Sequence, residues 1–292
     1  CGPTRKPEGW NVRNLNKKFL GRYHRTSDVV KYIEQIINRI KKILGIPAEY
    51  KILTVPGSTT GAMEAVIWSF LGEKKITSIV YDYWAQLWDS DLKKLNLDVE
   101  TRVSLNGEIP SFKNIPLDND ILFVWTGTST GMSINQINDF EANHQRLIIS
   151  DITSAVFIYD IPWKKIDISV FSWQKALGGE AQHGMIVLSP KSWERLKKNK
   201  KIPKLLDLAN HDFLINTPSL LSFADLEICL DAYEKRGNLH ENNKICIQNK
   251  GVIDDWLNSN IFLKRFSKSE IFDALTPSYM IPKKKNKFRK NT

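Results

Sequence analysis

The stretch KILTVPGSTTGAMEAVIWSFLG, residues 51–72, contains the pattern of a strand, a turn and a helix. Residues 51–56 form a short apolar run rich in branched side chains, which is typical of a buried strand. Glycine, serine and threonine follow at residues 57–61 and lead into a helical pattern at residues 61–72. Because strands alternating with helices build parallel sheets, this stretch predicts an α/β fold.

The same alternation continues on both sides of this stretch. Five further apolar runs predict strands at residues 78–82, 121–125, 147–151, 168–173 and 184–189. Helical patterns predict helices at residues 27–44, 88–97 and 222–236. We therefore expect a mostly parallel sheet covered by helices. The pattern weakens beyond residues 237–250, where the chain only becomes more polar.

Composition indicates a globular protein. The chain has 292 residues, 42% of them hydrophobic, which is enough to bury a large core. No window approaches the roughly 18 uncharged apolar residues of a membrane span. Its three cysteines are far apart and form no CxxC pair, so neither a disulfide framework nor a zinc site is expected. A soluble, cytoplasmic protein without a membrane partner is the expectation.

The net charge of +10 raises the question of nucleic acid, because phosphate contacts commonly use such an excess. Six of the 42 basic residues lie in KKKNKFRK at 283–290, a run without apolar periodicity, and others lie in RLKKNKKIPK at 195–204. Solvated faces and a basic tail explain these runs better than a groove-binding surface. We expect no nucleic-acid partner.

Polar residues follow three of the predicted strands, at the edge where open α/β sheets bind ligands. The turn at 57–61 opens a helix whose backbone amides suit a phosphate, although plain helix capping uses the same residues. Asp151 ends an apolar strand, where an acid needs a cation or a cap. Lys175 follows another strand and precedes Ala-Leu-Gly-Gly, small residues that leave room for a bulky group. A buried lysine is costly unless it is neutralised or used covalently.

The turn at 57–61, Asp151 and Lys175 follow one another along the chain. This order resembles that of the fold-type I enzymes that use pyridoxal 5'-phosphate. The segments SWQKALGGEAQHGMIVLSP, DITSAVF, GRYHR, CGPTRKPEGW and NTPSLLSF together resemble the phosphoserine aminotransferase family of class V aminotransferases. The resemblance runs from residue 1 to about residue 240, and the lysine segment is its most specific part. It implies a three-layer α/β/α large domain.

The resemblance also implies a role for each matching residue. Lys175 would bind the cofactor covalently and carry a proton between substrate and cofactor, and Asp151 would keep the cofactor's ring nitrogen protonated. The other implied cofactor contacts are Thr59, Thr60 and Gln174 at the phosphate, Thr128 at the ring hydroxyl, Trp88 or alternatively Trp84 over the ring, and Asn216 and Thr217 at the phosphate of the neighbouring subunit. A homodimer follows from the last pair.

His24 and Arg25 match the pair that receives the substrate phosphate in this family, and an arginine fork suits a dianion. The implied reaction transfers the amino group of glutamate to 3-phosphohydroxypyruvate, giving phosphoserine and 2-oxoglutarate in serine biosynthesis. By composition alone the two residues are an ordinary basic loop. His183 has no second ligand at i+4, so we expect a packed histidine and no metal.

Residues 1–240, including an N-terminal segment at 1–26, are expected to form the large domain, and residues 241–292 the start of an incomplete C-terminal small domain with a basic tail. Family members continue with a full small domain that supplies an arginine for the substrate carboxylate, so a catalytically impaired fragment is one reading. A different class V acceptor, as in alanine–glyoxylate transamination, is a second. A non-catalytic or nucleic-acid-binding protein that uses the positive charge is a third, but charge alone explains none of the residues after the strands.

Overall fold

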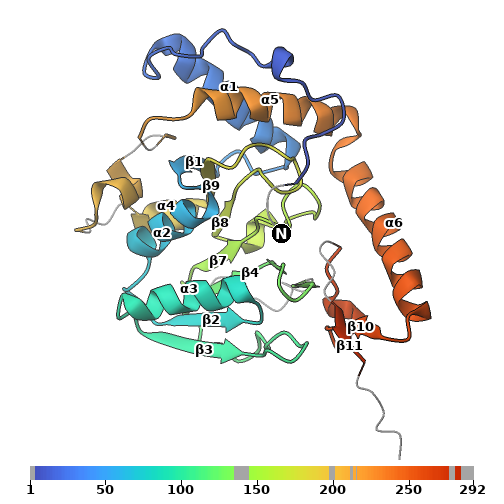
Figure 1. Ribbon diagram of the computed structural model, residues 1–292. Coiled ribbons are helices and arrows are strands. Elements are labelled where there is room, and N and C mark those ends of the chain that lie inside the picture. Colours follow the sequence, from blue (N-terminus) through green and yellow to red (C-terminus); the bar gives the residue numbers. More distant parts are fainter. Residues whose placement is uncertain are drawn as a thin grey trace, which may run out of the picture.

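A seven-stranded sheet forms the centre of the protein (Figure 1). The computed structural model describes residues 4–134, 145–196, 201–210, 213–214, 216–275 and 280–283. In spatial order the strands are β1 (Lys51–Pro56), β9 (His183–Leu188), β8 (Ile168–Phe171), β7 (Ile148–Asp151), β4 (Asp120–Val124), β2 (Ile76–Val80) and β3 (Val99–Val103). Only β9 runs antiparallel to its neighbours. The mostly parallel sheet predicted from the sequence is confirmed.

Helices cover both faces of this sheet. On one face lie α1 (Ser27–Ile43) and α5 (Leu220–Lys235), and on the other lie α2 (Ser58–Phe70), α3 (Tyr83–Lys94) and α4 (Pro190–Leu196). Each face has its own hydrophobic core, because successive side chains of a strand point to opposite faces. In β4, for example, Phe123 packs with the first group of helices, whereas Leu122 and Val124 pack with the second.

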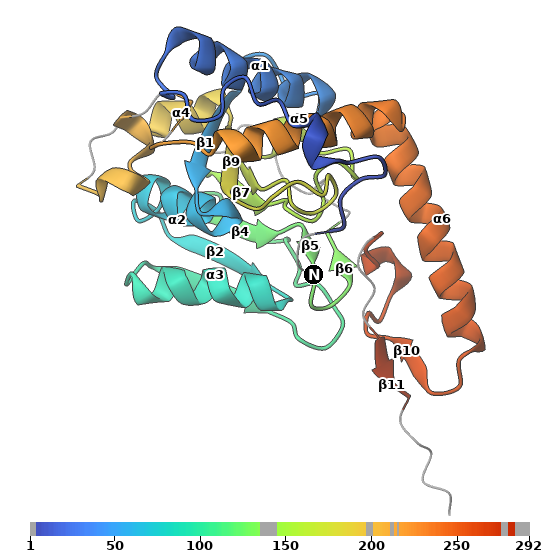
Figure 2. The ribbon, with the colours of Figure 1, turned by 45° about the horizontal axis from the view of Figure 1, so that its top comes forward.

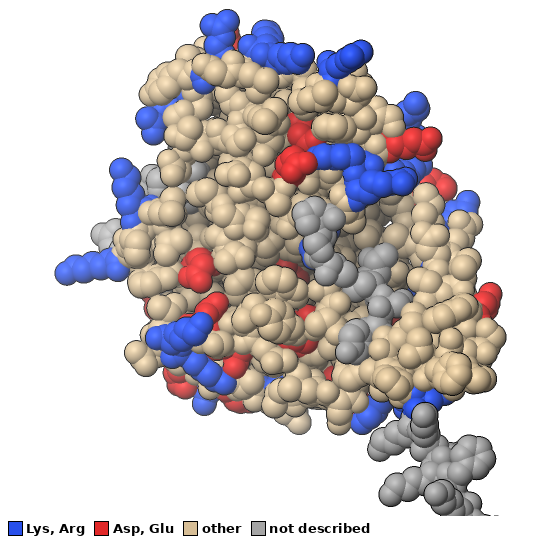
Figure 3. Space-filling model, viewed as in Figure 1, with Lys and Arg blue, Asp and Glu red and all other residues tan. Residues whose placement is uncertain are grey.

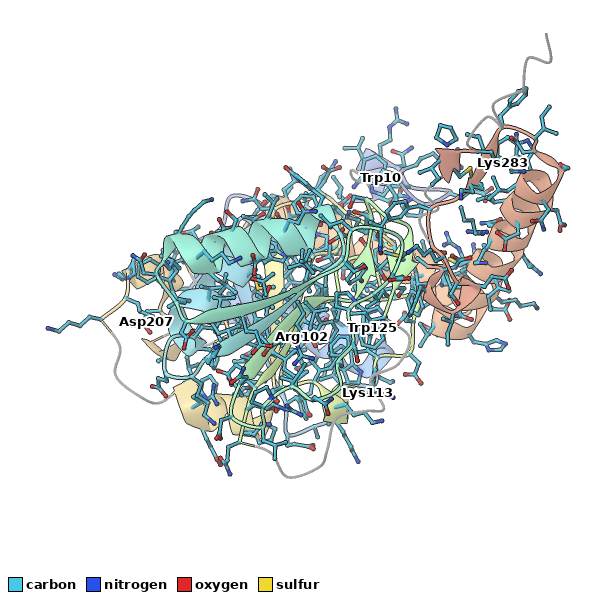
Figure 4. The ribbon with its side chains drawn as sticks, turned by 90° about the horizontal axis from the view of Figure 1, so that it is seen from below. Trp10, Arg102, Lys113, Trp125, Asp207 and Lys283 are labelled. Carbon is cyan, nitrogen blue, oxygen red and sulfur yellow. The ribbon has the colours of Figure 1, made fainter. Side chains whose placement is uncertain are left out.

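The predicted helices and strands all exist, with boundaries that differ by a few residues. The helix expected at 88–97 begins at Tyr83 because Asp82 caps it, accepting a hydrogen bond from the Ala85 amide. The strand β3 was not predicted, because its sequence VETRV is half-exposed at the sheet edge and lacks an apolar run. Arg102 of this strand donates to three carbonyls of residues 111–114 and so holds the loop before β4 (Figure 4).

After α5 the chain turns at Gly237 and continues as α6 (Asn238–Ser259), which runs down one side of the molecule (Figure 1). This helix was missed because only Asn242 and Leu257 are buried in it, so it shows no apolar stripe. The remaining strands are short: β5 (Thr126–Gly127) pairs with β6 (Met132–Ser133), and β10 (Leu263–Arg265) pairs with β11 (Met280–Pro282). The 3-10 turns are Val12–Asn14, Trp163–Lys165, Lys204–Leu206, Leu208–Asn210 and Glu270–Phe272.

The surface shows a dispersed positive charge. On the face seen in Figure 3, lysine and arginine side chains lie in separate groups, some along the outline of the molecule and some on the face itself beside acidic side chains. Of the two basic runs noted in the sequence, residues 284–290 and 197–200 lie outside the described residues. Within the described part of the chain, no helix is long and apolar enough to cross a membrane.

Candidate active site

A cavity of about 180 Å³ lies where the strands of the sheet end. Eight of the residues singled out in the sequence line it: Thr59, Thr60, Trp84, Trp88, Thr128, Asp151, Gln174 and Lys175. The other lining residues are Ser58, Val124, Thr126, Thr153, Ser154 and Ala181. Residues from five separate segments therefore meet at one place, as the rule for the carboxyl ends of parallel strands predicts.

Asp151, the last residue of β7, is the buried acid of the cavity and is 6% exposed. Its Oδ1 accepts hydrogen bonds from the Thr153 amide at 3.0 Å and from the Thr153 hydroxyl at 2.6 Å. Its Oδ2 accepts from Nε1 of Trp88 at 3.2 Å. Burial raises the pKa of Asp151, and these hydrogen bonds and the attraction of Lys175 act in the opposite direction.

A chain of hydroxyl groups continues from Asp151 beneath the cavity. The Thr153 hydroxyl is 2.8 Å from that of Thr59, which is 2.6 Å from that of Ser172. Thr59 lies at the start of α2 and Ser172 directly follows β8. These hydrogen bonds fix the orientation of the Asp151 carboxylate. They connect the segment after β7 with the start of α2 and the segment after β8. Thr153 and Ser172 were not identified from the sequence, since a serine or threonine after a strand is common in any protein.

Lys175 lies four residues beyond the end of β8 and is half-buried in the cavity. Desolvation lowers its pKa, whereas the charges of Asp151 and Asp82 raise it, and the net effect is a lowered pKa. A lower pKa increases the fraction of neutral amine, which is the nucleophilic form. The acid Asp82 was missed as a neighbour of Lys175, although it follows β2 in the same way that Asp151 ends β7.

The two tryptophans of α3 have different partners in the cavity. Trp88 is buried, at 3% exposed, and donates to Asp151. Trp84 is half-buried and donates from Nε1 to the Thr128 hydroxyl oxygen at 3.0 Å. Thr128 therefore keeps its hydroxyl hydrogen for another acceptor. Both aromatic candidates reach the cavity, so the choice between them rests on these hydrogen bonds.

The opening turn of α2 also lines the cavity. Gly57 caps the helix in a left-handed conformation, and the amides of Gly57 and Ser58 donate to the carbonyl of Gln182. The next amides, those of Thr59 and Thr60, belong to the first turn, whose N–H groups lack acceptors within the helix. Together with the helix dipole they favour an anion at this end of the cavity.

Four of the singled-out residues lie away from the cavity. His24 is half-buried and Arg25 is exposed in the loop before α1, and neither lines the cavity. The Nε2 atom of His24 has no hydrogen-bond partner among the described residues. Asn216 and Thr217 are exposed ahead of α5 and do not line the cavity either.

His183, the first residue of β9, is 2% exposed and packs against Trp173 and Phe223. Its Nε2 accepts a hydrogen bond from the Ser219 amide at 3.0 Å. Burial lowers its pKa to about 4. A neutral, packed histidine fits these contacts. Within the described residues, no group of three or more potential metal ligands occurs.

Comparison with known proteins identifies the family. No protein-family model matches the chain. Over 273 residues, however, it is 34% identical to a phosphoserine aminotransferase from Methanosarcina mazei, a match that covers 89% of this chain and 74% of the relative. The chain belongs to the phosphoserine aminotransferase family. A second member, from Methanosarcina barkeri, is 35% identical over 252 residues, covering 82% of this chain and 68% of the relative.

A solved structure has the same fold. The pyridoxal-phosphate-bound phosphoserine aminotransferase from Trichomonas vaginalis superposes with a TM-score of 0.79 at 17% identity, covering 95% of this chain and 82% of that one. The predicted fold-type I architecture is thereby confirmed.

Proposed function

We propose that the protein is a phosphoserine aminotransferase that uses pyridoxal 5'-phosphate to transfer the amino group of glutamate to 3-phosphohydroxypyruvate. The observation that carries this function is the meeting of Lys175 and Asp151 in one cavity of a chain that belongs to this family. The products would be phosphoserine and 2-oxoglutarate, which assigns the protein to serine biosynthesis.

The residues of the cavity fit the cofactor. A phosphorylated pyridine aldehyde needs an amine to bind its aldehyde, an acid for its ring nitrogen, a donor for its ring hydroxyl and amides for its phosphate. Lys175, Asp151, the Thr128 hydroxyl and the first turn of α2 offer these four groups around one space. When bound, the cofactor supplies an electron sink that stabilises the negative charge left on the substrate α-carbon.

Lys175 would carry out two steps. Its lowered pKa favours the neutral Nζ, the form that would hold the cofactor through its aldehyde carbon with loss of water. With the amino acid substrate in the site, the same Nζ would accept the proton of the substrate α-carbon and carry it between substrate and cofactor. No other lysine or histidine lines the cavity among the described residues, so Lys175 is the candidate base.

Asp151 would hold a proton at the cofactor's ring nitrogen. Because Thr153 donates to Oδ1, Oδ2 is the oxygen that would accept from the protonated ring nitrogen. Trp88 also donates to Oδ2. This contact orients the indole edge of Trp88 toward the carboxylate. Trp84, which is more exposed in the same cavity, is therefore the better candidate to cover the ring face.

We infer that the enzyme is a homodimer whose sites are shared. The substrate carries a phosphate and a carboxylate, yet Lys175 is the one cationic side chain among the described residues that line the cavity. His24, Arg25, Asn216 and Thr217 lie away from the cavity of their own chain, and the buried Nε2 of His24 has no hydrogen-bond partner among the described residues. A second subunit that brings them to the cavity would complete the phosphate sites.

The division into domains is part of the proposal. Residues 1–240 would form the cofactor-binding domain, and residues 241–292 the beginning of a small domain. The mainly exposed α6 and the paired strands β10 and β11, which lie beside the main body, support this division (Figure 1). A cytoplasmic location is inferred as well, since Cys229 and Cys246 are free thiols.

The reaction itself tests the proposal. Purified protein with pyridoxal 5'-phosphate, glutamate and 3-phosphohydroxypyruvate should form phosphoserine, and the Lys175→Ala variant should form none above background. Replacing His24 and Arg25 together by alanine should damage turnover of the phosphorylated acceptor far more than any turnover of alanine with glyoxylate. Equal losses on both substrate pairs would contradict the assignment of the phosphate site, and no phosphoserine would contradict the function.

A further inference from the structure

We propose that Asp225 is a positioning residue that fastens the N-terminal segment, residues 4–10, across the loop that carries Lys175. The importance of Lys175 rests on the proposed function, but the fastening does not. Asp225 lies in α5 and is 2% exposed. Its Oδ1 accepts from Lys6 Nζ at 2.7 Å and from Trp10 Nε1 at 2.9 Å, and its Oδ2 accepts from the Glu180 amide at 2.7 Å.

The carboxylate of Asp225 thus joins two segments that are far apart in sequence. Lys6 and Trp10 belong to the N-terminal segment, and Glu180 ends the loop at 174–180 that begins beside the cavity. Lys6 also forms an ion pair with the Glu180 carboxylate at 2.9 Å. Figure 2 shows the N-terminal segment passing the end of α5 toward the strand ends, and Figure 4 labels Trp10 at the side of the main body.

At its other end the N-terminal segment touches the backbone of the cofactor lysine. The Thr4 amide donates to the Gln174 carbonyl at 2.9 Å, and the Thr4 hydroxyl donates to the carbonyl of Lys175. The loop is therefore held from both sides, by Thr4 at its start and by Asp225 at its end. Its backbone, and with it the root of the Lys175 side chain, depends on the N-terminal segment.

The two glycines of this loop make the contact possible. The sequence indicated that Gly178 and Gly179 leave room for a bulky ligand, but the structure fills that space with protein. A Cβ on Gly178 would lie 2.7 Å from the Arg5 carbonyl oxygen, and the φ of +72° there also disfavours a side chain. A Cβ on Gly179 would lie 2.6 Å from the Trp173 ring. The glycines admit the N-terminal backbone and the Asp225 side chain.

Charge explains why the contact is specific. A buried carboxylate is costly unless cations and hydrogen-bond donors surround it. Lys6, Trp10 and the Glu180 amide supply three donors to Asp225. Burial alone would lower the pKa of Lys6, but its bonds to Asp225 and Glu180 outweigh that effect and raise it. Lys6 therefore stays charged, and removing it leaves Asp225 without its ionic partner.

Two variants test this positioning without replacing the buried acid itself. Lys6→Met removes the ion pair and keeps most of the side-chain length, and Trp10→Phe removes one hydrogen bond and keeps the ring. Lys17→Met, an exposed cation of the same N-terminal region, is the matched control. Hydrogen–deuterium exchange of the protein without cofactor reports on residues 174–181 directly. The Kd of pyridoxal 5'-phosphate and the pH midpoint of its visible band report on Lys175.

We expect Lys6→Met to raise exchange at residues 174–181 and to raise the Kd by about tenfold, the value of one charge-assisted hydrogen bond. Lys6→Arg should restore both, and Lys17→Met should change neither. If Lys6→Met shows the same exchange at residues 174–181 as Lys17→Met, the proposal is overturned. An increase in exchange that is equally large in β4 and β7 would also overturn it. If the unsubstituted protein binds no cofactor, the proposed function fails, while the exchange data still decide the role of Asp225.

Discussion

At the residue scale, the two tryptophans of α3 are separable because each donates to a different group. Trp88→Phe keeps an aromatic ring but removes the donor to Asp151. Since that hydrogen bond lowers the pKa of Asp151, its loss should raise the pKa further and weaken the carboxylate's hold on a protonated ring nitrogen. We expect the Kd of pyridoxal 5'-phosphate to rise about tenfold, as measured by fluorescence titration.

The matched variant is Trp84→Phe, which removes the donor to Thr128 and keeps a ring that can stack. Its Kd should stay within about threefold of the unsubstituted value, whereas Trp84→Ala should lose the stacking as well. If Trp84→Ala binds the cofactor normally and Trp88→Ala does not, the residue that covers the ring is Trp88, the first of the two candidates implied by the family resemblance.

At the element scale, a buried ion pair joins α4 to the sheet at the end opposite the cavity. Arg195 Nη1 lies 2.6 Å from Asp120 Oδ2, and Asp120 Oδ1 accepts from the Leu147 amide. Arg195→Met would leave a fully buried carboxylate without its cation, which costs about 3–5 kcal/mol of unfolding free energy. Chemical denaturation measures this loss, and adding Asp120→Asn should recover part of it. A loss below about 1 kcal/mol would mean that the pair behaves like an exposed one.

His183 links β9 to the start of α5, and its protonation should weaken the fold. Its pKa is lowered from 6.5 to about 4, so between these values the unfolded chain binds a proton that the folded chain does not. Stability should therefore be complete above pH 6.5 and fall by about 3 kcal/mol as the pH approaches 4. In the His183→Gln variant this part of the acid dependence should disappear. Denaturation curves of both proteins from pH 4 to 8 measure this dependence. If the unfolding free energies of the two proteins change equally with pH, His183 is not the cause.

Most of the fold could be predicted from local patterns, because a buried strand or an amphipathic helix shows its period within a few residues. Asp151 and Lys175 could be found because Asp151 ends an apolar strand and Lys175 follows one. The half-exposed β3 and the thinly buried α6 lack such a period and were missed. The bond of Lys6 to Asp225 spans 219 positions, and no local pattern reports a contact of that kind. For the same reason the sequence alone predicts ligand space at Gly178 and Gly179, where the structure has the N-terminal segment and Asp225.

At the scale of the whole molecule, shared sites predict that two inactive variants restore each other. In the proposed homodimer, Lys175→Ala would lack the cofactor amine and Arg25→Ala would lack the phosphate ligand, so neither variant should be active by itself. In a mixed dimer one of the two sites would contain both residues intact, if Arg25 comes from the partner. Co-refolding equal amounts should therefore return about a quarter of the unsubstituted activity. A mixture as inactive as its components would contradict shared sites.

In the proposed function, Lys175 is the residue that binds pyridoxal 5'-phosphate. The most direct measurement is borohydride reduction of the protein loaded with the cofactor, followed by mass spectrometry of its peptides. We predict that the visible absorption band disappears on reduction and that the peptide containing Lys175 gains the mass of the reduced cofactor. Lys175→Ala should show neither the band nor the adduct. A cofactor mass found on another lysine, or a visible band that persists in Lys175→Ala, would contradict the claim.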